Sequence, residues 1–174
     1  DDASWLYPDY VKAFKSYNCP GTQNSIRPEK IVAKPNPPND KVIYDLTDNA
    51  VNKTAFGTSY EIFGTFSEPN PDKPSENTPL KKTVSSVNSK VLKIYRDAIG
   101  SRAGVSQVLL FLDADDSGSE GLGSTHNNWP DKEDNHGDSG TCMNFCDGHA
   151  QWVKRTAYLR VLNMSQDGNA KQPD

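Results

Sequence analysis

The stretch that most constrains the fold runs from Asn135 to Val153 and has the pattern of a β-hairpin. At its centre, Asp147-Gly148 is a dipeptide that tolerates the positive φ angles of a two-residue type I′ turn. Side chains alternate along a strand, so this register gives one apolar face, suited to packing on a helix, and one mostly polar face. The apolar face comprises Met143, Phe145, Ala150 and Trp152, and the polar face comprises Asn144, Cys146, His149 and Gln151.

Apolar periodicity predicts the remaining elements. Gln107–Leu112 is the strongest strand, a continuous apolar run expected to be buried on both faces. Thr156–Met164 has the spacing of a closing helix, with a strand as the alternative. Less regular patterns predict helices over 8–14 and 88–99, strands over 42–46 and 59–66, and an exposed loop over 69–79.

These elements predict an α+β fold, in which an antiparallel β-sheet packs against helices. A length of 174 residues suits a single domain spanning 1–174, with a mobile tail from about Asp167. Only 34% of the residues are hydrophobic, and Gly and Pro number 12 each, so we expect a soluble, loop-rich domain. A net charge of −4 without a Lys/Arg stripe argues against a nucleic-acid partner.

The closing run Asn144–Val153, NFCDGHAQWV, together with His136 upstream, resembles the C-terminal signature of pseudopilin-like proteins. In that family a histidine, nine intervening residues and an Asp-Gly pair lead into a phrase of the form F-x-DGH-x-x-W/V. Here ten residues separate His136 from Asp147, and one extra residue in the loop 137–140 accounts for the difference. The resemblance identifies His136, Asp147, Gly148 and His149 as the motif residues.

The resemblance implies the same α+β architecture and a non-enzymatic structural subunit of a pseudopilus or pilus-like assembly, related to type II secretion. Its partners would be other pseudopilins or subunits of the secretion apparatus. The family begins with a long hydrophobic anchor helix, which is absent from this chain and which we expect to have been removed. The chain would be exported, on the periplasmic or extracellular face of the inner membrane, and would meet the membrane only through that helix.

Two other functions remain open. An extracellular glycan-binding or protein-binding module could use exposed aromatic residues such as Trp129, which stands beside Pro130. A metal-dependent hydrolase could use the polar cluster 131–138 together with His126 and His149, because Asp and His are standard metal ligands. The sequence identifies no catalytic residue for either.

A second acidic cluster follows the strongest strand and imitates a calcium-binding loop. The pattern D-x-D-x-S-G begins at Asp113 and offers alternating oxygen ligands for a hard cation. Ser124 occupies the twelfth position, where such loops place a bidentate Glu. The pattern makes calcium the candidate cofactor. The resemblance to major pseudopilins of type II secretion, which have a C-terminal calcium site, implies the same ion. The candidate ligands are Asp113, Asp115, Asp116 and Ser117.

The chain has three cysteines, Cys19, Cys142 and Cys146. Cys142 and Cys146 are four residues apart on one predicted strand, about 13 Å at strand rise, which is beyond disulfide reach. The sequence therefore allows one disulfide at most, from Cys19 to Cys142 or Cys146, and three reduced thiols are the alternative.

Overall fold

The computed structural model describes residues 2–33, 40–47, 56–69, 77–113, 129–132 and 134–171. The chain divides into two compact units, and each unit is assembled from two stretches of sequence. The first unit combines Asp1–Ile62 with Asp113–Asp138, and the second combines Phe63–Leu112 with Ser139–Asp174. The strands pair antiparallel and are accompanied by helices, so the predicted α+β class is confirmed. Among the described residues, no helix has the length and apolar character needed to cross a membrane.

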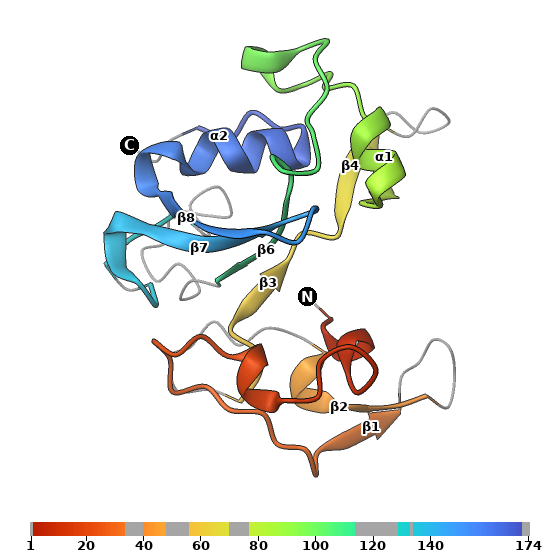
Figure 1. Cartoon of the computed structure of the whole chain (residues 1–174), viewed down its shortest axis with the longest axis vertical. Helices are drawn as coiled ribbons and strands as arrows, with labels where there is room; N and C mark the ends of the chain where they lie inside the picture. The colour runs from red at the N-terminus through yellow and green to blue at the C-terminus, as the bar shows by residue number, and fades with distance from the viewer. Residues whose placement is uncertain are drawn as a thin grey trace. The chain divides into compact units, whose positions relative to one another are not determined.

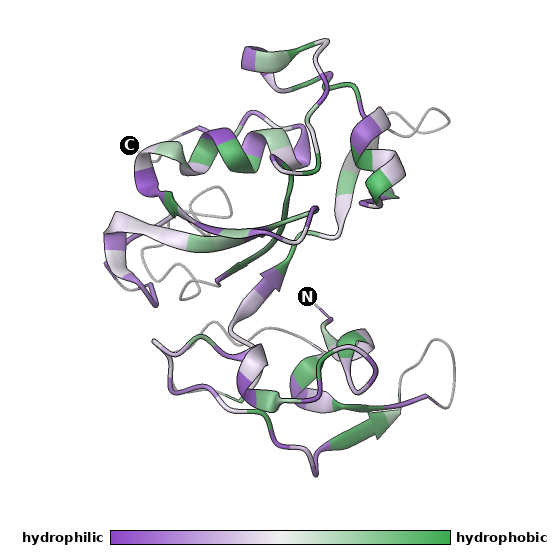
Figure 2. Ribbon diagram, viewed as in Figure 1, coloured by the Kyte–Doolittle hydropathy of each residue, from purple (hydrophilic) through white to green (hydrophobic). Residues whose placement is uncertain are grey.

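The first unit consists of short elements around a small core formed by Ala3, Tyr17, Ile43 and Leu46. Strand β1 (Ile31–Ala33) is apolar, as its green colour in Figure 2 shows, yet Ile31 is 58% exposed. The elements are three 3-10 helices, at Ser4–Leu6, Phe14–Tyr17 and Tyr44–Leu46, and the strands β1 (Ile31–Ala33), β2 (Lys41–Ile43) and β3 (Tyr60–Ile62).

Two predictions in the first unit are wrong in detail. The helix expected over 8–14 is absent; the N–H groups of Tyr10 and Val11 both donate to the Leu6 carbonyl, which makes a turn. Tyr10 is 76% exposed, so no buried face stabilises a helix there. The strand expected over 42–46 ends at Ile43, because Asp45 turns inward to bind Arg27.

In the second unit, β6, β7 and β8 form consecutive antiparallel pairs, and α2 packs against β4, β7 and β8 (Figure 1). A second cluster of buried residues, including Phe66, Val87 and Tyr95, forms part of its core. The elements are β4 (Thr65–Pro69), β5 (Asn77–Lys81), α1 (Val84–Ser89), β6 (Leu109–Asp113), β7 (Gly140–Phe145), β8 (Ala150–Lys154) and α2 (Arg155–Gln166), with 3-10 helices at Arg96–Ala98 and Gly137–Ser139.

The strand predicted over 107–112 and the closing helix predicted over 156–164 are confirmed as β6 and α2. The strand expected over 59–66 is instead divided between β3 and β4. The loop expected over 69–79 is wrong at both ends, because Pro69 belongs to β4 and Asn77–Pro79 belongs to β5; residues 70–76 lie outside the described residues.

The closing hairpin exists, but its predicted register is wrong by one residue. Asn144 pairs with Ala150 and Cys142 pairs with Trp152, and the Phe145 N–H donates to the His149 carbonyl at 2.9 Å. The loop therefore has three residues, of which only Gly148 has a positive φ, +89°. A three-residue loop that ends in a left-handed glycine is the standard alternative to a type I′ turn.

The shift changes which side chains are buried. Met143 and Phe145 are buried, each 1% exposed, as predicted. On β8, however, Val153 is buried and Trp152 is 42% exposed, so the expected apolar pair of Ala150 and Trp152 faces outward. The one-residue difference in register places Val153 instead of Trp152 on the buried face, and Val153 is the one buried residue of β8.

The helix expected over 88–99 is wrong over most of that range: α1 covers Val84–Ser89, and beyond it only Arg96–Ala98 is helical, as a 3-10 helix. Thr83 caps α1 through a capping box with Ser86, and the helix ends at Ser89. The next residue, Lys90, turns its ammonium group inward to Asp167, 2.8 Å away. A long-range ion pair therefore replaces the helical continuation that local periodicity predicted.

The tail expected to be mobile from about Asp167 is held by hydrogen bonds as far as Ala170. The Asp167 carboxylate accepts from the N–H groups of Lys93, Ile94 and Tyr95, and it is almost fully buried. Ala170 exchanges two hydrogen bonds with the Asn163 side chain. These residues complete the second unit and are part of its fold.

Candidate functional site

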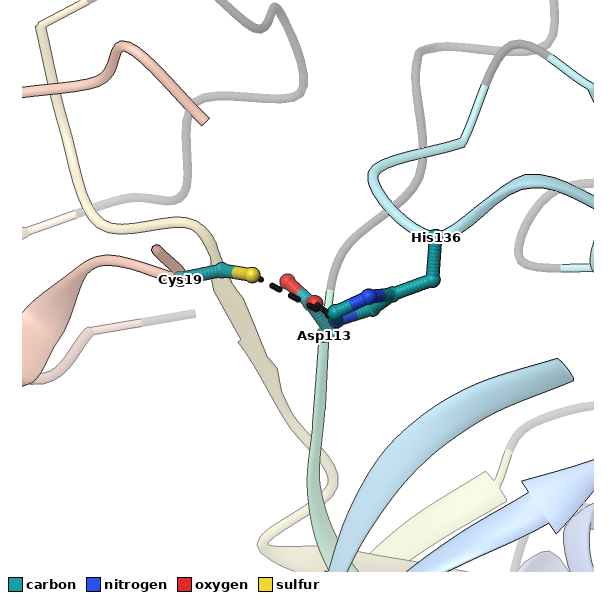
Figure 3. Close-up of side chains that lie close together, drawn as sticks. All are labelled: Cys19, Asp113 and His136. Atoms are coloured by element: carbon teal, nitrogen blue, oxygen red, sulfur yellow. Dashed lines mark hydrogen bonds and ion pairs between the residues drawn. The ribbon is translucent and has the colours of Figure 1, made fainter. Parts of the chain in front are cut away.

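Three side chains from separate stretches of the first unit meet at one point (Figure 3). Cys19 lies in a tight turn that follows the second 3-10 helix, Asp113 ends β6, and His136 immediately precedes the last 3-10 helix. Cys19 Sγ lies 3.4 Å from His136 Nε2, which lies 2.6 Å from Asp113 Oδ2. One ligand atom of each residue lies within 4.8 Å of the other two.

Local hydrogen bonds fix the position of Cys19. Its N–H donates to Ser59 Oγ at 2.6 Å, and its carbonyl accepts from the N–H of Thr22 at 3.1 Å, which closes the turn Cys19-Pro20-Gly21-Thr22. Within that turn the Gly21 N–H donates to Cys19 Sγ at 3.2 Å. An N–H donor at this position favours the charged thiolate over the neutral thiol.

The Asp113 carboxylate divides its two oxygens between two partners. Asn135 Nδ2 donates to Oδ1 at 2.9 Å, while Oδ2 faces His136. The Asp113 side chain is 1% exposed and that of His136 is 29% exposed. A buried carboxylate is thus held in one orientation, with Oδ2 directed at the imidazole.

The geometry does not support nucleophilic catalysis by a Cys-His-Asp relay. Such a relay requires the nucleophile on one imidazole nitrogen and the orienting carboxylate on the other. Here Cys19 and Asp113 both approach Nε2 of His136. Three donor atoms that converge on one point are instead the arrangement of ligands around an ion.

The other signature residues form a separate, self-contained turn. The Asp147 carboxylate accepts from the His149 N–H at 3.1 Å and contacts His149 Nδ1 at 2.6 Å. The hydrogen bond with the His149 side chain lowers the pKa of Asp147. The His149 ring stacks on Phe145, with centroids 4.6 Å apart and planes nearly parallel. Asp147, Gly148 and His149 thus stabilise the hairpin bend.

The structure places the predicted site residues in different surroundings. Of the candidate calcium ligands, Asp113 joins the Cys19–His136 cluster, whereas Asp115, Asp116 and Ser117 lie outside the described residues, as does His126. Cys19, Cys142 and Cys146 are free cysteines, so of the two alternatives that the sequence allows, the structure has three thiols and no bridge from Cys19. Trp129 is 7% exposed, which contradicts the expectation that it offers an open aromatic surface.

Sequence reasoning missed the cluster because its members are far apart in the chain. In the sequence, Asp113 belongs to the calcium-like acidic cluster and His136 to the polar cluster 131–138. Cys19 stands apart from both, as a candidate for a disulfide. The one local signal was the turn Cys19-Pro20-Gly21, which is compatible with an N–H donor to the sulfur. No local pattern indicates that this turn lies beside the end of β6.

No family model matches the chain, and no curated protein or solved structure matches it either.

Proposed function

We propose that this chain is the globular part of a pseudopilin-like structural subunit, which acts in a type II secretion system or a related pilus-like assembly. The proposal depends on the resemblance of the closing stretch, His136 with NFCDGHAQWV, to the pseudopilin signature. On this interpretation the chain is exported, is not an enzyme, and has other subunits of the assembly as its partners.

The observation that best supports this proposal is that three of the signature residues, Asp147, Gly148 and His149, stabilise the hairpin bend. Asp147 and His149 bond to each other and Gly148 makes the bend, while Phe145 and Met143 fill the core beneath. A motif built in this way maintains a scaffold, because its polar groups are occupied within the turn. A subunit that assembles through a separate anchor needs such a scaffold.

The proposal is tested first on the gene that encodes the chain. We expect the codons upstream of Asp1 to specify a short basic leader, a Gly before a Phe-like residue, and about 20 apolar residues. Overproduction of the full-length protein in its native cells should then give short filaments visible by electron microscopy. Two results together would refute the assembly role. They are an upstream region that encodes no apolar segment, and a protein that cross-links to no secretion subunit.

A glycan-binding module is the second proposal. Because Trp129 is buried, this module would use another aromatic pair, Trp5 and Tyr10. Trp5 is 54% exposed and Tyr10 is 76% exposed, and their rings meet edge to face with centroids 6.3 Å apart. Exposed aromatic rings are suited to stacking on sugars. A glycan array distinguishes the two functions: binding that disappears in Trp5→Ala would favour this module.

A further inference from the structure

The geometry points to a zinc-binding site in the first unit, formed by Cys19, Asp113 and His136. This inference stands apart from the proposed assembly role, because it depends only on three side chains and their immediate neighbours. The described residues supply three protein ligands, and zinc takes one more ligand to complete its tetrahedron.

The chemistry of the three donors selects zinc over calcium or magnesium. The set contains one sulfur, one imidazole nitrogen and one carboxylate oxygen. Zinc accepts all three donor types, whereas calcium and magnesium prefer oxygen ligands alone. The Asp113 carboxylate, a candidate calcium ligand from the sequence, thus lies beside a nitrogen and a sulfur donor. These are the neighbours expected of a zinc ligand.

The distances are close to those of a tetrahedral zinc site. Zinc bonds of about 2.3 Å to sulfur and about 2.1 Å to nitrogen and oxygen place sulfur and nitrogen ligands about 3.6 Å apart and nitrogen and oxygen ligands about 3.4 Å apart. Cys19 Sγ and His136 Nε2 are already 3.4 Å apart. The 2.6 Å contact between His136 and Asp113 must open by about 0.8 Å, as it would when an ion comes between the two atoms.

His136 is the ligand that can make this adjustment. Its side chain is 29% exposed, so its ring can tilt with little cost in packing. Asp113 is fixed by Asn135, which leaves Oδ2 directed at the site, and Cys19 is fixed by Ser59. Two ligands are therefore preorganised, and the third completes the set.

Neighbouring groups hydrogen-bond to two of the ligands and hold them in place. Asn135 Nδ2 orients the carboxylate, and the Gly21 N–H stabilises the thiolate that zinc requires. Gly21 is also packed tightly: a Cβ there would lie 3.0 Å from the Asn135 carbonyl oxygen and 3.4 Å from Cys19 Sγ. The turn that carries the sulfur is therefore in contact with the loop that carries His136.

The test is metal titration of the full chain after dialysis against a chelator. Cobalt(II), a spectroscopic substitute for zinc, should bind with one equivalent per chain and give the near-ultraviolet band of a thiolate ligand. Zinc should then displace the cobalt, whereas excess calcium should not. A chain that binds no equivalent of cobalt or zinc, or that releases cobalt to calcium, would overturn the assignment.

Matched variants assign the ligands. Cys19→Ser should abolish the thiolate band, while Cys142→Ser, which removes an exposed thiol, should leave it unchanged. His136→Gln should weaken zinc binding by at least about 100-fold and His149→Gln should not, whereas Asn135→Ala should weaken it by about 10–100-fold. If Cys19→Ser fails to fold, as judged by circular dichroism, the partly exposed His136 decides: unchanged zinc affinity in His136→Gln would refute the site.

Discussion

The buried ion pair between Lys90 and Asp167 gives the sharpest test of how the second unit is held together. The two side chains are 3% and 1% exposed and lie 2.8 Å apart. Burial by itself would raise the pKa of Asp167, but hydrogen bonds from Lys90 and from the N–H groups of Ile94, Lys93 and Tyr95 outweigh it and lower the pKa to about 2. The charged carboxylate is therefore strongly favoured in the folded chain.

The pKa difference gives the contribution to stability. From an ordinary value of 3.8 to about 2, the difference corresponds to about 2.5 kcal/mol, since one pKa unit is worth about 1.4 kcal/mol. Because the folded-state pKa of this acid is lowered, its stabilisation is fully present above pH 3.8 and is lost as the pH falls toward 2.

Asp167→Asn should destabilise the protein by about 3–5 kcal/mol at neutral pH, because it breaks a buried ion pair by removing the carboxylate that faces the Lys90 ammonium. At about 2–4 °C per kcal/mol for a chain of this size, Tm should fall by roughly 10 °C. Urea unfolding measures the change, with Asp9→Asn, an exposed aspartate, as the control.

Two further measurements separate the ion pair from general damage to the fold. The double variant Lys90→Met, Asp167→Asn should be more stable than Asp167→Asn alone, since it also removes the buried ammonium group that the carboxylate neutralised. The difference between wild type and Asp167→Asn should also narrow as the pH falls to about 3. A variant within about 0.5 kcal/mol of wild type at pH 7 would refute the reasoning.

Three other predictions concern single positions. Gly140→Ala should lower stability by about 3 kcal/mol or more, because a Cβ there would lie 2.2 Å from a carbonyl oxygen of the facing strand at a φ of +154°. Gly104→Ala, where the nearest atom is 4.0 Å away, is the control in the same thermal melts, and equal Tm values would contradict the clash. Arg27→Lys should cost about 1–3 kcal/mol in urea unfolding, because lysine cannot reproduce the contacts of 2.9 and 2.7 Å from Nε and Nη2 to the Asp45 carboxylate. The pKa of Asp45 is lowered by its hydrogen bond to Arg27, so this cost should shrink in acid and a pH-independent difference would count against the pair. Burial lowers the pKa of Lys82 to about 8, so its reaction with an amine-directed reagent, followed by mass spectrometry, should rise through pH 8. Reactivity that rises only near pH 10 would show that the amine is solvated.

Local sequence patterns predicted the elements that depend on neighbouring residues. The apolar run of β6 and the helical spacing of α2 are visible in the sequence, and both elements are present. The hairpin was also located correctly, but Asp147-Gly148 is compatible with loops of two or three residues. The structure has the three-residue loop, in which Asp147 keeps a negative φ and its carboxylate accepts a hydrogen bond from the His149 N–H.

Elements that depend on distant partners could not be predicted in this way. The helix α1 stops before Lys90 because that side chain pairs with Asp167, which lies beyond the end of α2. The cluster at His136 likewise requires Cys19, 117 residues earlier in the chain, to lie beside it. Periodicity within a short window contains no information about either contact.

The two units are interleaved along the chain, and this determines when each of them can form during synthesis. The polypeptide passes from one unit to the other after Ile62, again after Leu112 and a third time after Asp138. Neither unit corresponds to a continuous fragment, so a product truncated before Asp138 would contain an incomplete version of both. A ribosome must therefore release most of the chain before the first unit has all its parts, and the second must wait for the last strands and helix α2.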